Sequence, residues 1–298
     1  MPAVELLKRP LRPGLRRFRS ATARQRILPS FLVLGAQRAG TSTLFFHLRQ
    51  HPEISGPRGA EKSVDWPKEL HFFDEKFGKG VDWYRAFFPL EASRSLARRR
   101  GRDRIAGEAT PNYLFHPQAP PRAAEVLPSA RLIALLRDPV ERAYSHYQLM
   151  HRTGRENLTF VDALAAEEER LAGERDAMQT VPDFRGPHHR HHAYVTRGLY
   201  AEQLERWLEH FSREQLLVIR AEDLRDRPAE IFAQTLAFLG VQPWMPARFE
   251  LRNAAEYTPI DRALGAELAE RFAESNRRLA RLLGRDLGWD DVTVAAPR

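Results

Sequence analysis

A continuous apolar run near the start of the chain is the strongest indication of its fold. Residues 31–34 read FLVL, and they are followed by Gly35, a polar loop over residues 36–42, and a stretch up to residue 51 with apolar residues at helical spacing. A short apolar run without alternation is typical of a strand that is buried on both faces. The chain is therefore predicted to open with a strand, a glycine-bounded loop and a helix.

Two later runs repeat this pattern, since both Arg131–Leu136 (RLIALL) and residues 215–219 (QLLVI) lead into helical or polar stretches. Further helices are predicted over residues 158–173, 201–211, 228–239 and 261–283. Apolar strands that alternate with helices indicate a parallel sheet covered on both faces. We predict an α/β fold of three layers, with a central parallel sheet flanked by helices.

The length of 298 residues fits one large domain or two ordinary ones. Because the chain has neither an internal repeat nor a Gly/Ser linker, we predict one domain over residues 30–298. Residues 1–29 carry eight Lys and Arg side chains against Glu5 alone, which is +7 of the net charge of +8. Such an arm can bind nucleic acid or an acidic membrane surface, or can be a loosely ordered tail, and we expect the tail.

The composition excludes several classes of protein. With no cysteine, the chain has no disulfide framework, no thiolate zinc site and no cysteine nucleophile. No apolar run is long enough to span a membrane, and the basic start lacks the apolar core of a secretory signal. From these absences we expect a cytoplasmic location and no membrane span.

The loop after the first strand, residues 35–42 (GAQRAGTS), has the frame of a phosphate-binding loop. Its glycines permit a turn and a close backbone approach, and the following helix presents N–H groups and a positive dipole end. Thr41 stands where nucleotide hydrolases have lysine, and the cation is Arg38 instead. We expect this loop to bind a phosphate-like anion without the usual lysine and magnesium.

A second anion-binding motif follows the second strand. Arg137 stands at its carboxyl end, where open α/β sheets bind ligands, and Pro139 favours the start of a helix. The guanidinium of Arg137 matches phosphate oxygens, and the Ser145 hydroxyl can add a bond. For Arg142 a phosphate contact and a structural role, as a helix cap or in a surface ion pair, are equally open.

Together the two motifs resemble the sulfotransferase family that uses 3′-phosphoadenylyl sulfate (PAPS) as sulfuryl donor. Residues 37–43 (QRAGTST) are similar to its 5′-phosphosulfate loop, and Arg137-Asp138-Pro139 with Arg142, Ser145 and Tyr147 is similar to its 3′-phosphate motif. Other stretches resemble the heparan-sulfate (N- and 3-O-) sulfotransferase branch. These are residues 68–74 (KELHFFD), 80–89, 108–114 (EATPNYL), 197–208 and 276–289.

The resemblance implies a P-loop-like fold and a sulfuryl transfer from PAPS to a hydroxyl or amine of an acceptor, without a metal. It also implies which residues bind the donor. For the 5′-phosphosulfate they are Arg38, Ala39, Gly40, Thr41, Ser42 and Thr43, and for the 3′-phosphate Arg137 and Ser145.

The same resemblance makes residues 68–74 the candidate catalytic strand. Alternate residues of a strand share a face, which would place Glu69 and His71 side by side with Phe73. The resemblance implies that Glu69 is the base and that His71 supports the acceptor or shares the proton. Arg38 replaces the family's usual lysine, and because arginine keeps its proton, it would stabilise the leaving group by charge alone.

Three features leave the acceptor open. Ala109 stands where the heparan-sulfate branch has lysine. Residues 252–257 (RNAAEY) stand where that branch has a basic, glycine-containing loop, but they carry fewer basic residues, so Arg252 is only a weak candidate for binding phosphate. A small molecule or a glycan is possible, and the motifs favour a carbohydrate or glycolipid. The cluster His188, His189, His191 and His192 is expected to form a solvated or acceptor-lining loop rather than a metal site, and the tyrosines Tyr113 and Tyr200 are expected in the core.

Two other functions remain as alternatives. A nucleotide kinase or hydrolase could use the same loop, although the missing lysine argues against it. A nucleic-acid-binding protein could act through the basic arm, although the rest of the chain is nearly neutral, and no nucleic acid is expected.

Overall fold

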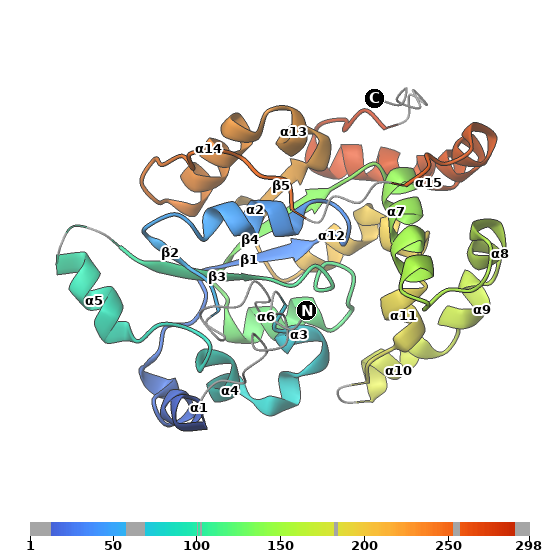
Figure 1. Cartoon of the computed structure of the whole chain (residues 1–298). Helices are drawn as coiled ribbons and strands as arrows, with labels where there is room; N and C mark the ends of the chain where they lie inside the picture. Colours follow the sequence, from blue (N-terminus) through green and yellow to red (C-terminus); the bar gives the residue numbers. More distant parts are fainter. Residues whose placement is uncertain are drawn as a thin grey trace, which may run out of the picture.

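A computed structural model describes residues 13–57, 69–99, 101, 103–181, 184–252 and 257–289. Five parallel strands form one sheet in the order β2-β3-β1-β4-β5 (Figure 1). The strands are β1 (Phe31–Gly35), β2 (Ile54–Ser55), β3 (Ile105–Ala109), β4 (Arg131–Leu136) and β5 (Leu216–Arg220). The predicted parallel sheet is thus confirmed, with the phosphate-loop strand β1 at its centre.

Helices cover both faces of the sheet (Figure 1). On one face lie α2 (Thr41–Leu48), α13 (Ala221–Asp226) and α14 (Pro228–Leu239), and on the other α3 (Phe72–Glu75) and α6 (Ala119–Val126). The other helices are α1 (Pro13–Ala21), α4 (Val81–Arg85), α5 (Glu91–Arg99), α7 (Pro139–Arg152), α8 (Phe160–Ala165), α9 (Glu167–Leu171), α10 (Glu174–Thr180), α11 (Pro187–His191), α12 (Tyr200–Leu208) and α15 (Arg262–Leu283). The predicted three-layer α/β fold is confirmed.

The core explains why the apolar runs were informative. Every residue of β1 is buried, and so is β4 from Leu132 onward, because strands in the middle of the sheet have helices on both faces. The predicted helix over residues 158–173 is divided into α8 and α9. The sequence prediction missed β2, which is only two residues long, and β3, whose sequence IAGEA contains a glycine and a carboxylate.

Part of the predicted N-terminal arm folds against the domain. The guanidinium of Arg26 is buried and donates a 2.7 Å hydrogen bond to the carbonyl of Phe88, and Ala23 and Ile27 are buried beside it. Residues 1–12 of the arm lie outside the described residues. None of the described helices is both long and apolar enough to cross a membrane.

Candidate active site

The loop between β1 and α2 has the geometry of an anion site. Gly40 is the N-cap of α2 with φ 89°, a left-handed conformation that glycine adopts without steric cost. The first N–H groups of a helix have no partner within it, and they carry the positive end of the helix dipole. The start of α2, at Thr41, therefore offers donors to a bound anion.

Arg38 lies in this loop with an unusual backbone. Among the residues that the structure describes, Arg38 (φ 74°) and His71 (φ 53°) are the two non-glycine residues with positive φ. Such strain is typical of functional positions, where the surrounding structure holds it in place. The Nε of Arg38 donates a 3.0 Å hydrogen bond to the hydroxyl of Ser145, and burial lowers the pKa of Arg38. This bond joins the two motifs, although they are far apart in the chain.

Arg137 is held at the carboxyl end of β4. Its guanidinium donates to the Glu141 carboxylate (3.0 Å), to the Tyr257 hydroxyl (3.4 Å) and to the backbone carbonyl of Arg38 (3.4 Å). Burial alone would lower the pKa of Arg137, but Tyr257 and Glu141 raise it. The Tyr200 hydroxyl donates to the Arg137 carbonyl (2.9 Å), so this buried tyrosine supports the site.

Asp138, the next residue, starts α7 as its N-cap. Its carboxylate accepts hydrogen bonds from the amides of Val140 (2.8 Å) and Glu141 (3.0 Å), and its own amide donates to Glu222 (3.0 Å). Burial raises the pKa of Asp138 to about 6. The motif after β4 is therefore fixed by helix capping on one side and by α13 on the other.

The two motifs enclose one cavity of about 300 Å³. All eight residues that the resemblance assigns to the donor line it: Arg38, Ala39, Gly40, Thr41, Ser42, Thr43, Arg137 and Ser145. The remaining lining residues are Ala221, Glu222, Leu224, Arg225, Leu251, Arg252 and Tyr257. Those from α13 were not predicted, although their place after the third apolar strand is where open α/β sheets bind ligands.

Arg252 lies at the rim of this cavity. Its amide donates to the Thr43 hydroxyl (2.9 Å), and its guanidinium lies 4.5 Å from the ring centre of Phe46. The chain segment that reaches the cavity is thereby attached to α2. The next residues of the predicted basic loop, 253–256, lie outside the described residues.

A second cavity of about 290 Å³ continues from the first along α7. The two share Arg38, Ser145 and Tyr257. The second cavity is also lined by Gln148, Leu149, His151 and Arg152. Neither Glu69 nor His71 is among the described residues that line either cavity.

The predicted catalytic strand is not a strand. Of residues 68–74, residue 68 lies outside the described residues, residues 69–71 are irregular, and α3 begins at Phe72. Phe73 is buried in the core against Tyr84, so it does not share a face with Glu69 and His71. The turn at His71, with its positive φ, is what brings the two predicted catalytic residues together.

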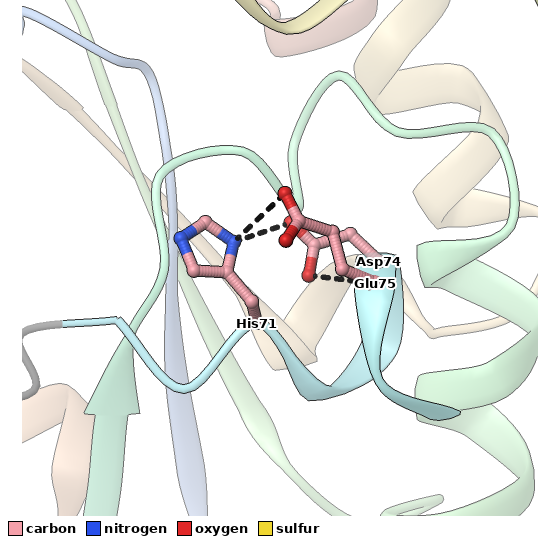
Figure 2. Close-up of side chains that lie close together, drawn as sticks. All are labelled: His71, Asp74 and Glu75. Atoms are coloured by element: carbon pink, nitrogen blue, oxygen red, sulfur yellow. Dashed lines mark hydrogen bonds and ion pairs between the residues drawn. The ribbon is translucent and has the colours of Figure 1, made fainter. Parts of the chain in front are cut away.

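His71 is the centre of an acidic cluster. Its Nε2 lies 3.0 Å from a carboxylate oxygen of Glu69, and its Nδ1 lies 2.8 Å from Asp74 and 3.9 Å from Glu75. Figure 2 shows one ring nitrogen directed at Asp74 and Glu75, while the other points away from them. Burial alone would lower the pKa of His71, but the hydrogen bonds to Asp74 and Glu69 raise it to about 10, so the ring is an imidazolium at neutral pH.

The same cluster bears on whether a metal could bind. One ligand atom each of His71, Asp74 and Glu75 lies within 4.8 Å of the others, a spacing that one cation could bridge. However, Asp74 is bonded to His71 and to the Asn112 amide (2.8 Å), and Glu75 is ion-paired with Arg190. These protein bonds already engage the three side chains, and we assign no metal to them.

The predicted histidine loop is a short helix, α11, and not a loop. His188 and His192 approach each other at their Nδ1 atoms (3.0 Å), whereas His189 is buried and stacked on Phe115 at 3.9 Å between ring centres. Arg190, in the middle of this run, contacts the acidic cluster, which no sequence pattern indicated. The two structural roles predicted for Arg142, a helix cap and a surface ion pair, are wrong, because its side chain is fully buried and donates to the carbonyl of Tyr194.

Comparisons with known proteins agree with the sequence motifs. Residues 28–255 match the family model described as "Sulfotransferase domain". A human bifunctional heparan sulfate N-deacetylase/N-sulfotransferase 3 is 33% identical over 222 residues, covering 72% of this chain and 23% of that protein. The Dictyostelium discoideum membrane-associated sulfotransferase kil1 is 27% identical over 329 residues, covering 89% of this chain and 67% of that protein.

A solved structure also matches. The crystal structure of a sulfotransferase from Alicyclobacillus acidocaldarius aligns with a TM-score of 0.60 and 33% identity, and covers 88% of this chain and 99% of that one. The chain thus spans less than a quarter of the length of the human relative, but nearly all of the bacterial structure.

Proposed function

Since the chain belongs to the sulfotransferase domain family, we propose that it transfers a sulfuryl group from PAPS to a hydroxyl or amine group of an acceptor. The observation that carries this proposal is that the eight residues which the resemblance assigns to the donor, from two distant motifs, line one cavity. Neither motif alone would distinguish a sulfuryl donor from other phosphate-containing ligands.

The charge of the cavity fits this donor. PAPS carries two anionic groups, the 5′-phosphosulfate and the 3′-phosphate, and when bound it supplies a sulfuryl group on a phosphate leaving group. The lining includes four arginines: Arg38, Arg137, Arg225 and Arg252. The start of α2 with Arg38 would hold the phosphosulfate, and Arg137 with Ser145 the 3′-phosphate.

Arg38 stands between the two anion positions. It is bonded to Ser145 and lies next to the N-terminus of α2, so its charge can act on either group. Its proposed part in the reaction is electrostatic: a fixed cation stabilises negative charge that develops on the leaving phosphate.

We assign the base to Glu69. Its carboxylate is 37% exposed, so an acceptor can reach it, and it would take the proton that the hydroxyl or amine loses. His71 already carries a proton at neutral pH and cannot serve as the base; it would instead orient Glu69 through their 3.0 Å contact.

The proposed acceptor is a carbohydrate or glycolipid. The names of several relatives contain heparan sulfate N-sulfotransferase, which motivates a glycan with a free amino group as the first acceptor to test. Because this chain has Ala109 where that branch has lysine, we expect weaker dependence on a highly charged glycan. The cytoplasmic location stays a prediction from the sequence.

Calorimetric binding of adenosine 3′,5′-bisphosphate, the spent donor, without magnesium tests the donor site. We expect binding that is much tighter than that of ATP, and an affinity at least about tenfold lower in Arg137→Ala, which loses a charge-assisted phosphate contact. The control is Arg277→Ala, which removes an exposed arginine of α15 whose ion pair, among the described residues, is with Glu274 of the same helix. A preference for ATP that requires magnesium would refute the proposal and favour a nucleotide kinase or hydrolase.

A further inference from the structure

We propose that Arg190 is a positioning residue of the sulfuryl-transfer site, because its guanidinium holds Glu75 away from His71 and thereby keeps the imidazole aligned with Glu69. The inference rests on the function proposed above. It concerns a residue of α11, far from both donor motifs in the sequence.

The contacts of Arg190 place it at the acidic cluster. One terminal nitrogen forms an ion pair with the Glu75 carboxylate, and the other lies 3.4 Å from Nε2 of His71. That same Nε2 lies 3.0 Å from Glu69. The guanidinium therefore lies beside the ring nitrogen of His71 that faces Glu69, the proposed base.

Arg190 is one member of a closed circuit of polar contacts, in which its guanidinium pairs with the Glu75 carboxylate and the amide of Glu75 donates to Asp74 (2.9 Å). His71 contacts Asp74, whose carboxylate accepts from the Asn112 amide (2.8 Å); the Asn112 oxygen accepts from Arg197 (3.0 Å). Arg197, which is fully buried, donates in turn to the backbone carbonyl of Arg190 (3.3 Å). Of this circuit, Figure 2 shows His71, Asp74 and Glu75. The circuit connects α3, the segment after β3, and α11, so both the guanidinium and the backbone carbonyl of Arg190 are held relative to the imidazole.

The competition at Nδ1 of His71 explains what Arg190 does. This nitrogen carries one proton, and two carboxylates approach it: Asp74 at 2.8 Å and Glu75 at 3.9 Å. Glu75 is only 8% exposed, so without a cation its charge would be buried and would seek the imidazolium. Arg190 pairs with Glu75 and holds its carboxylate at 3.9 Å from Nδ1, beyond hydrogen-bond distance, so that Asp74 at 2.8 Å accepts the Nδ1 proton and Nε2 stays directed at Glu69.

Four variants separate this role from simple stabilisation. Arg190→Gln removes the charge, Arg190→Lys keeps it, and the double variant Glu75→Gln with Arg190→Gln removes the competing carboxylate as well. The control is Arg175→Gln, which makes the same change at an exposed position on the neighbouring helix α10. Each is assayed by thermal unfolding, by binding of adenosine 3′,5′-bisphosphate, and by sulfuryl transfer from PAPS to de-N-sulfated heparan sulfate.

For Arg190→Gln we expect kcat to fall roughly 10- to 100-fold, with unchanged KM for PAPS and unchanged bisphosphate affinity, because a misaligned base slows the chemical step and not donor binding. Arg190→Lys should recover part of the rate. The double variant should be more active than Arg190→Gln alone, and Arg175→Gln should match the wild type. An unchanged kcat in Arg190→Gln, or no gain in the double variant, would overturn the proposal.

A spectroscopic measurement keeps this inference separate from the proposed function. In ¹⁵N-histidine NMR spectra, the ring signals of His71 should move in Arg190→Gln and return toward their wild-type positions in the double variant. If wild-type protein binds the bisphosphate but transfers nothing to the glycan, only the proposed acceptor fails, and these signals still test Arg190. Signals that stay in place in Arg190→Gln would refute its positioning role. If that variant does not fold, the double variant decides: His71 signals far from their wild-type positions there would refute the competition between Glu75 and Asp74.

Discussion

A buried carboxylate close to α3 should make the stability of this protein depend on pH. Glu108, on β3, is fully buried and accepts hydrogen bonds from the hydroxyls of Tyr84 (2.6 Å), Thr110 (2.9 Å) and Tyr113 (3.0 Å). Burial raises the pKa of Glu108 to about 7, even though the three hydroxyls lower it. The Tyr113 hydroxyl also accepts a hydrogen bond from the amide of Phe72 (2.8 Å), so this network supports the start of α3.

The size of the effect follows from the pKa difference. The ordinary pKa of this carboxyl is 4.5, so the rise to about 7 corresponds to about 3 kcal/mol at 1.36 kcal/mol per pKa unit. Because the folded pKa of Glu108 is raised, its contribution to stability is fully present below pH 4.5 and is lost as pH rises through about 7. The Glu108→Gln variant lacks this titration. The difference in free energy of unfolding, wild type minus variant, should therefore fall by about 3 kcal/mol as pH rises from below 4.5 to above about 7.

Urea denaturation of both proteins at several pH values between about 4 and 8 measures this difference. His71 also has a raised pKa, but its contribution changes between pH 6.5 and about 10 in both proteins and largely cancels when one curve is subtracted from the other. A difference that stays constant within about 0.5 kcal/mol would show that the pKa of Glu108 is close to its ordinary value, and would refute the argument from burial.

Two further variants test other contacts of the site. His71→Gln should remove the part of the wild-type stability that is fully present below pH 6.5 and is lost as pH rises toward about 10. Denaturant titrations at about pH 6 and pH 9 would detect this loss. If the free energy of unfolding changed equally with pH in the two proteins, the raised pKa of His71 would be contradicted. Tyr257→Phe removes the 3.4 Å bond to Arg137, and it should weaken binding of adenosine 3′,5′-bisphosphate by only about two- to fivefold in calorimetry, because a single long, partly exposed hydrogen bond contributes about 0.5–1 kcal/mol. A loss as large as that of Arg137→Ala would instead make Tyr257 a principal ligand of the 3′-phosphate.

The parts of the fold that the sequence predicted depend on local patterns. β1, β4 and β5 are short apolar runs because the middle of a parallel sheet is covered on both faces, and this burial leaves a pattern in the sequence itself. β3 lacks that pattern, because Gly107 and Glu108 interrupt it. Its buried carboxylate is tolerated only through hydroxyls from other segments, which the sequence of β3 does not indicate.

The meeting of the two predicted anion-binding motifs at one cavity was foreseeable for a related reason. The turn at Gly40, the start of α2 and the capped start of α7 are each built from residues that are neighbours in the chain, so their chemistry can be read from spacing. The meeting point of the loop after β1 and the loop after β4 is also predictable, because the carboxyl ends of adjacent parallel strands lie at one edge of the sheet. Arg252 and Tyr257 are harder to foresee, since they reach the cavity from a segment without regular structure.

By itself, the sequence determined the strand–loop–helix units, the two anion-binding motifs and the family to which the chain belongs, because each of these is recorded in residues close together in the chain. Only the tertiary structure decided that residues 69–71 turn instead of forming a strand, and that Arg190, 119 positions after His71, completes the cluster around the imidazole. The physical reason is that a buried charge must find its partner through space. The helix that brings Arg190 to Glu75 is positioned by packing against segments that are distant in the sequence, and the pattern of one segment does not record which other segment it packs against.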